Sequence, residues 1–135
     1  MNLMKTLFVV PEIRLDAAPN HIPFWAGILS AIVKNKKGQV AILDLNALRA
    51  RYNGKQVPNK IIEEEVASEK WDLIGIGGLT TTYSRIKELA PLITKNSPDS
   101  VFIGGGGWST YNPVEILKLI PQLDMLVLGE GEETF

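Results

Sequence analysis

The chain has 135 residues, with 14 Lys and Arg, 15 Asp and Glu, one His and no Cys. This length suits one domain, and a composition of 45% hydrophobic and 21% charged residues excludes a disordered chain. A formal net charge of −1 argues against a generic nucleic-acid binder, which carries a basic excess. The absence of Cys excludes disulfides, thiolate nucleophiles and Cys-ligated zinc or iron–sulfur sites within these residues.

No apolar segment reaches the roughly 18 residues that a membrane-spanning helix needs. The first apolar run, residues 6–10, is too short for the core of a signal peptide, and no small-residue cleavage site follows it. We therefore expect a domain without a membrane span and with a cytoplasmic location.

Apolar runs and amphipathic segments alternate along the chain. Residues 7–10 form an apolar run that predicts the first strand, and residues 23–36 carry apolar side chains at the spacing of a helix. The alternation continues with strands at 40–43, 73–76, 101–103 and 125–128, separated by helices at 59–70, 84–96 and 114–120. The strands lack inside–outside alternation, which is typical of strands buried on both faces. The least regular stretch is 46–58, with a turn at Asn53-Gly54.

This order predicts an α/β fold, in which a doubly wound parallel sheet lies between two layers of helices. A five-stranded sheet of this kind most often has the flavodoxin-like strand order 2-1-3-4-5. Ligands of such sheets bind beyond the carboxyl ends of the strands, near the switch between strands 1 and 3.

The predicted third strand is followed by Gly77-Gly78, then by Leu79 and three consecutive threonines, Thr80, Thr81 and Thr82. Glycines let a ligand approach the backbone, and the hydroxyls offer short neutral donors and acceptors. The alternative is a plain strand exit with a helix cap, which needs only one hydroxyl.

The fourth strand leaves through four glycines, residues 104–107, followed by Trp108. This excess of glycine suggests a backbone surface without side chains, on which a broad, flat ligand could lie. The alternative is a flexible loop. The chain has neither G-x-G-x-x-G after the first strand nor G-x-x-x-x-G-K-[ST], so a dinucleotide or P-loop site is not supported.

The fifth strand leaves through Gly129, Glu130 and Gly131. Acidic residues at this place also fit the capping of a helix. The only imidazole, His21, lies on the connection after the first strand, where a surface or capping role is more typical than metal coordination.

Taken together, these three exits resemble the cobalamin-binding domain that precedes the radical S-adenosylmethionine (radical SAM) domain in a large enzyme family. The resemblance covers the whole chain and is most specific at residues 124–135, which closely match the family's D-x-x-V-x-G-E-G-E-x-T-F junction. Residues 72–81 and 101–105 are similar to the strand-three and strand-four loops of cobalamin domains.

The resemblance implies that a corrin ring lies over the carboxyl edge of the sheet and that the nucleotide tail threads between the sheet and the helices. A tail close to the strands needs glycine, and it needs hydroxyl and amide partners. Trp108 is expected either to cover an apolar edge of the ligand or to pack in the core. The candidate cofactor-binding residues are Leu79, Thr80, Thr81, Thr82, Gly104, Gly105, Gly106, Gly107, Trp108, Gly129, Glu130 and Gly131.

Two departures from the family pattern bear on the cofactor. Gly77 replaces the serine of the usual Ser-x-Leu, so a hydrogen bond to the benzimidazole would come from Thr80 or Thr81. The Asp-x-His-x-x-Gly motif of methyl-transferring domains is absent, because Asp16 and His21 are five residues apart. No His lower ligand to cobalt is therefore expected.

We expect residues 1–135 to form a cobalamin-binding module without catalytic residues or a protein metal ligand of its own. The resemblance implies a downstream radical SAM domain in the same polypeptide, which would hold a [4Fe-4S] cluster through Cys-x-x-x-Cys-x-x-Cys and bind SAM. The parent would then be a methyltransferase or a cyclase. The expected partners are a corrinoid and that domain.

Three alternatives stay open. A phosphoacceptor receiver needs acidic residues after the first strand, Asp after the third and Lys after the fifth, where this chain has Pro11-Glu12, Gly77 and Gly129-Glu130. A flavin or small-nucleotide binder would share the fold, as would a degenerate domain that only packs on a partner.

Overall fold

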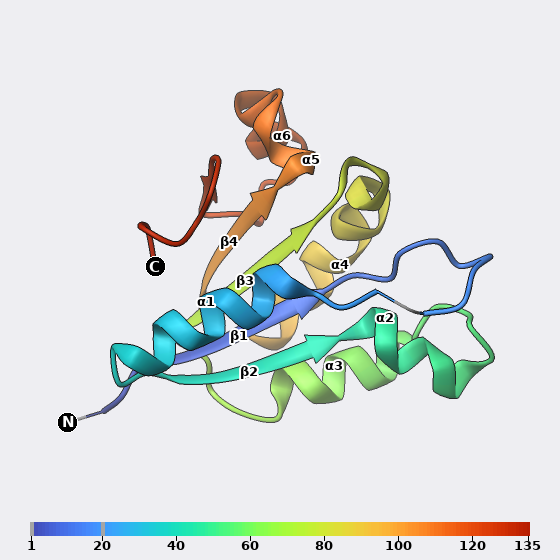
Figure 1. Ribbon diagram of the computed structural model, residues 1–135, viewed down its shortest axis with the longest axis horizontal. Helices are drawn as coiled ribbons and strands as arrows, with labels where there is room; N and C mark the ends of the chain where they lie inside the picture. The colour runs from blue at the N-terminus through green and yellow to red at the C-terminus, as the bar shows by residue number, and fades with distance from the viewer. Residues whose placement is uncertain (1, 20) are drawn as a thin grey trace.

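The computed structural model describes residues 2–19 and 21–135. Its five strands form one parallel sheet in the order β2-β1-β3-β4-β5 (Figure 1), which confirms the predicted flavodoxin-like α/β topology. The strands are β1 Lys5–Val10, β2 Gln39–Asp44, β3 Leu73–Gly78, β4 Val101–Gly106 and β5 Met125–Val127.

The helices in the described residues fall between the strands. They are α1 Phe24–Asn35, α2 Leu45–Leu48, α3 Asn59–Ala67, α4 Tyr83–Asn96, α5 Gly107–Thr110 and α6 Pro113–Leu119, with short 3-10 helices η1 Arg49–Tyr52 and η2 Thr80–Thr82. Of these, α1, α3, α4 and α6 lie at the predicted places, whereas the short helices α2 and α5 were not predicted. The stretch 46–58, which the sequence marks as the least regular, is partly helical. Its first turn forms because the Asp44 carboxylate accepts a hydrogen bond from the Ala47 amide at 2.9 Å and so caps α2.

Helices cover the two faces of the sheet unequally. On one face α3, α4, α5 and α6 contribute to a large core with Leu7, Ile74, Ile76 and Phe102 of the strands. On the other face a small cluster joins Phe8 and Val10 of β1 to α1, which lies over β1 and β2. Within the described residues, no helix covers the α1 side of β3 and β4 (Figure 1).

Burial of the strands follows this arrangement. β1 and β3 are almost wholly buried, as their uninterrupted apolar runs predict. The same prediction is wrong for the edge strands, where Ile42 of β2 is 43% exposed and Met125 of β5 is 49% exposed. An edge strand has a neighbour on one side only, so fewer side chains cover it.

In the part of the chain that the structure describes, no helix is both long enough and apolar enough to cross a membrane.

Candidate functional site

Glycines of β3 and β4 pair with one another at the carboxyl edge of the sheet. β4 continues past the predicted end at residue 103, and its register sets Gly77 beside Gly105 and Gly78 beside Gly106. The alternative of a flexible loop is therefore wrong for residues 104–106, which are strand.

Glycine is required at Gly106 and Gly77 for different reasons, and a Cβ at Gly78 would likewise collide with Thr82 Oγ1. Gly106 has a φ of +109°, and a Cβ there would lie 2.6 Å from the Gly78 carbonyl oxygen. At Gly77 the reason is close approach, because a Cβ would lie 2.9 Å from the Trp25 indole. The α1 side of β3 is therefore bare backbone against which an aromatic ring rests.

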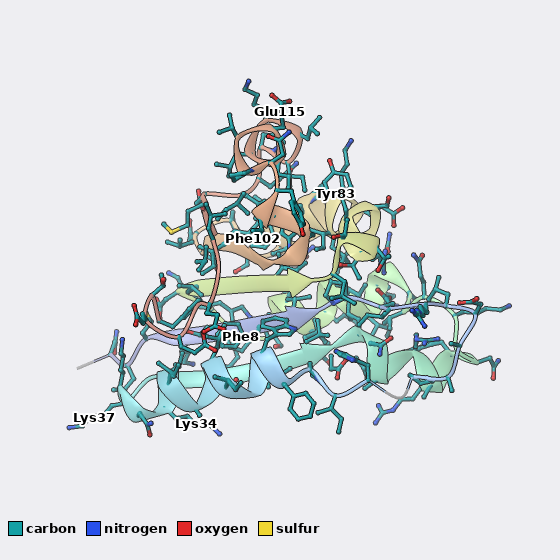
Figure 2. The ribbon with its side chains drawn as sticks, turned by 45° about the horizontal axis from the view of Figure 1, so that its top comes forward. Phe8, Lys34, Lys37, Tyr83, Phe102 and Glu115 are labelled. Atoms are coloured by element: carbon teal, nitrogen blue, oxygen red, sulfur yellow. The ribbon has the colours of Figure 1, made fainter. Side chains whose placement is uncertain are left out.

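The paired glycines Gly77, Gly78, Gly105 and Gly106 form the glycine strip. A cavity of about 410 Å³ lies between α1, the glycine strip and the C-terminal segment, residues 129–135. Its walls are mainly apolar, with Phe8, Phe24, Trp25 and Phe135 as the aromatic members. The Phe8 ring packs edge-on against Trp25 at a centroid distance of 6.0 Å and against Phe135 at 5.5 Å. Figure 2 shows Phe8 on the face of the sheet that carries α1.

Most of the predicted site residues line this cavity. They come from the exits of three strands, which the parallel sheet brings to one edge. These residues are Leu79, Thr82, Gly104, Gly105, Gly106, Gly107, Gly129, Glu130 and Gly131. Whether they hold a cofactor stays a prediction.

The other three predicted residues lie elsewhere. Thr80 and Thr81 are exposed on η2, outside the cavity wall. Trp108 is 4% exposed, packs in the large core on the opposite face, and donates a hydrogen bond from Nε1 to the Gly105 carbonyl at 2.7 Å. Of the two roles expected for Trp108, the structure therefore shows core packing.

Polar groups at the cavity are few. The Thr82 hydroxyl already donates to the Leu79 carbonyl at 2.7 Å, which leaves its oxygen only as an acceptor. The ionisable side chains in the wall are His21, Glu130 and Glu132, and all three are exposed. Among the described residues, no three His, Cys, Asp or Glu side chains gather in a way that could hold a metal ion. The arrangement is suited to an uncharged, flat group rather than to an ion.

Sequence reasoning missed the contacts that hold the loop between β1 and α1 beside this cavity. Glu12, only 5% exposed, accepts hydrogen bonds from Arg85 Nε at 2.8 Å, Arg85 Nη2 at 3.0 Å and the Val57 amide at 3.0 Å. Burial opposes the charge of Arg85, but the hydrogen bonds and charge of Glu12, followed by those of Glu88, outweigh it and raise the pKa of Arg85.

A second buried cation fixes the same loop. Arg49, 1% exposed, donates to the carbonyl oxygens of Gly54, Ile13, Arg14 and Ala17 at 2.6–3.0 Å. Its Nε donates to Oδ1 of Asn46, and the same oxygen accepts the Ile13 amide. No pattern in the sequence separates Arg49 from the exposed Arg51, so only the fold could identify it.

The family model of the B12-binding domain, described as "B12 binding domain", matches residues 13–135. The chain belongs to this family. The match spans α1, the glycine strip and the C-terminal segment around the cavity, and it begins after the wall residues Phe8, Val10 and Pro11.

Curated relatives of this B12-binding domain are much longer proteins. The chain is 26% identical over 133 residues to an anaerobic magnesium-protoporphyrin IX monomethyl ester cyclase of Rubrivivax gelatinosus, covering 96% of the chain and 23% of that protein. It is 32% identical over 92 residues to the enzyme of the same name from Synechocystis, covering 67% of the chain and 18% of that protein. The chain thus spans about a quarter or less of the relatives it matches.

Solved structures share the fold at low identity. The radical S-adenosylmethionine methyltransferase TsrM from Kitasatospora setae, with cobalamin and a [4Fe-4S] cluster bound, superposes with a TM-score of 0.79 at 19% identity, covering 98% of the chain and 25% of TsrM. The cobalamin-dependent S-adenosylmethionine radical enzyme OxsB, with aqua-cobalamin bound, gives 0.79 at 17% identity, covering 96% of the chain and 17% of OxsB. A response regulator from Burkholderia pseudomallei gives 0.61 at 14% identity, covering 96% of the chain and 63% of the regulator. The B12-binding domain therefore shares its architecture with receivers as well.

Proposed function

We propose that this B12-binding domain binds cobalamin, with the nucleotide tail in the cavity between α1 and the glycine strip. The observation that carries the proposal is the cavity itself, which is mainly apolar, about 410 Å³ in volume and lined by Trp25 of α1 and by the glycines of β3 and β4. That volume is within the usual range for small-molecule sites, about 300–1,000 Å³, and it suits one limb of a corrinoid rather than the whole molecule. The corrin ring would then lie outside, over the carboxyl edge of the sheet.

The residues present fit such a tail. Gly105 adds no side chain to the cavity wall, and Phe8 and Trp25, which pack over Gly75 and Gly77, offer aromatic edges to a planar base. Thr82 Oγ1 offers one acceptor, whereas the hydrogen bond from Thr80 or Thr81 to the benzimidazole that the sequence predicted is not part of this proposal, because both side chains lie outside the cavity wall. His21 lines the wall on an exposed loop, and we propose no role for it as a cobalt ligand.

We further propose that the domain is the cobalamin module of a radical SAM enzyme, a methyltransferase or a cyclase. Bound cobalamin supplies the cobalt chemistry, while this chain binds and orients it toward a catalytic domain. The [4Fe-4S] cluster and SAM would be held by that domain in the same polypeptide. The full reading frame tests this part, which requires Cys-x-x-x-Cys-x-x-Cys after Phe135 and is contradicted if that motif is lacking.

Retention of a corrinoid tests the binding. The purified chain is mixed with hydroxocobalamin, desalted and scanned for corrin absorbance, with an equal sample mixed with flavin mononucleotide beside it. We expect retained pink or orange corrin absorbance and no retained yellow flavin. Retention of flavin alone would favour a flavin binder, and retention of neither would favour a domain that only packs on a partner.

A further inference from the structure

The ring of Phe135 stands between two cavities. It lines the main cavity, and it also lines a smaller one of about 190 Å³ on the other side, near Leu3, Met4 and Gly38. Met4 and Gly38 lie at the amino ends of β1 and β2, opposite the edge where a corrinoid would enter. Phe135 is therefore the residue that the two cavities share, on the side of the main cavity that faces the amino ends of the strands.

Contacts from three directions hold this residue in place. Its ring packs edge-on against Phe8 at a centroid distance of 5.5 Å. Its carbonyl oxygen accepts a hydrogen bond from Lys36 Nζ, and its amide donates to the Gly131 carbonyl at 3.0 Å. The segment 131–135 thus forms a closed turn that keeps the ring against the α1 face of the sheet.

We infer that Phe135 is a specificity-determining residue, which limits how deep the base of a corrinoid's nucleotide tail enters and so which lower base is accepted. The inference rests on the proposed function. A planar base that reaches the Phe8 ring meets the Phe135 ring next, and an aromatic edge stabilises a two-ring base while blocking a longer one. Removing the ring would join the two cavities and extend the space inward.

Binding of three corrinoids to wild-type and variant chains tests this inference. The probes are cobinamide, which has no base, cobalamin, whose base has two fused rings, and naphthimidazolyl-cobamide, whose base has three. Wild type is expected to bind the three-ring form at least about tenfold more weakly than cobalamin, since that base would collide with Phe135. In Phe135→Ala the order is expected to reverse, while the affinity for cobinamide changes less than about twofold.

Two further variants complete the design. Phe135→Leu keeps most of the volume and is expected to reject the three-ring base as wild type does. Tyr111→Ala removes an aromatic ring that is 90% exposed and outside both cavities, and is expected to change nothing. If wild type binds corrinoids and Phe135→Ala discriminates among them as wild type does, the inference is overturned and the proposed function stands. If wild type binds none of the three, the proposed function is overturned and the inference with it.

Discussion

Arg85 of α4 donates hydrogen bonds from Nε and Nη2 to the carboxylate of Glu12, and this pair closes the base of the loop beside the cavity. Both side chains are nearly inaccessible, 9% and 1% exposed. The loop between β1 and α1 supplies one wall of the cavity, so the ion pair links the stability of the fold to the shape of the site.

Removing one partner of this pair is expected to be strongly destabilising. Glu12→Gln leaves the Arg85 charge without its main partner, at a cost of about 3–5 kcal/mol in the free energy of unfolding. Chemical denaturation measures this loss. Glu88→Gln is the matched control, because Glu88 contacts the same guanidinium at 3.2 Å but is 61% exposed, and it should cost less than about 1 kcal/mol. Equal losses from the two variants would contradict this account.

Replacing Arg49 by lysine is expected to lower the stability of the domain. One ammonium group cannot reach the four carbonyl oxygens that the guanidinium serves, so Arg49→Lys leaves buried acceptors unpaired and costs about 2 kcal/mol. Hydrogen exchange should show faster exchange of the amides of residues 13–17. Arg51→Lys, at an exposed position of the same 3-10 helix, should leave both the stability and the exchange unchanged. Unchanged exchange in Arg49→Lys would show that other contacts hold the loop.

Two adjacent glycines are expected to differ sharply. Gly106→Ala sets a Cβ at a φ of +109° and 2.6 Å from a carbonyl oxygen, which should lower the free energy of unfolding by about 1–3 kcal/mol. In Gly107→Ala the new Cβ meets no atom within 4 Å, so the change should stay within about 0.5 kcal/mol. Thermal unfolding of the two variants compares them directly. A Gly106→Ala variant as stable as Gly107→Ala would mean that the strand exit adjusts freely.

The fold could be read from the sequence because its signals are local. Uninterrupted apolar runs placed all five strands, and the amphipathic segments between them implied parallel pairing. The ends of β3 and β4 were missed, because glycine has a weak strand preference alone and forms strand here only through the pairs Gly77–Gly105 and Gly78–Gly106.

The site was predictable in its location but not in its details. The topology rule placed the exits of β3, β4 and β5 at one edge, and most of the predicted residues line the cavity there. Trp108 was ambiguous, because which face of the sheet it packs against depends on where the chain turns after Gly106. The aromatic wall of Phe8 and Trp25 and the buried cations Arg49 and Arg85 depend on contacts distant in sequence, which no local pattern reports.

The central claim is that the cavity between α1 and the glycine strip receives part of a cobalamin molecule, and a paired titration tests it most directly. Hydroxocobalamin is titrated into wild type, Gly77→Leu and Gly27→Ala while the corrin spectrum is followed, and circular dichroism verifies that each chain is folded. The new side chain of Gly77→Leu would collide with the Trp25 indole, which lies 2.9 Å from the new Cβ, so that the two side chains together crowd the cavity; a Cβ at Gly27 meets no atom within 4 Å and serves as the control. We predict saturable binding by wild type and Gly27→Ala, and at least about tenfold weaker binding by folded Gly77→Leu. Absence of binding to wild type, or equal binding by Gly77→Leu, would contradict the claim.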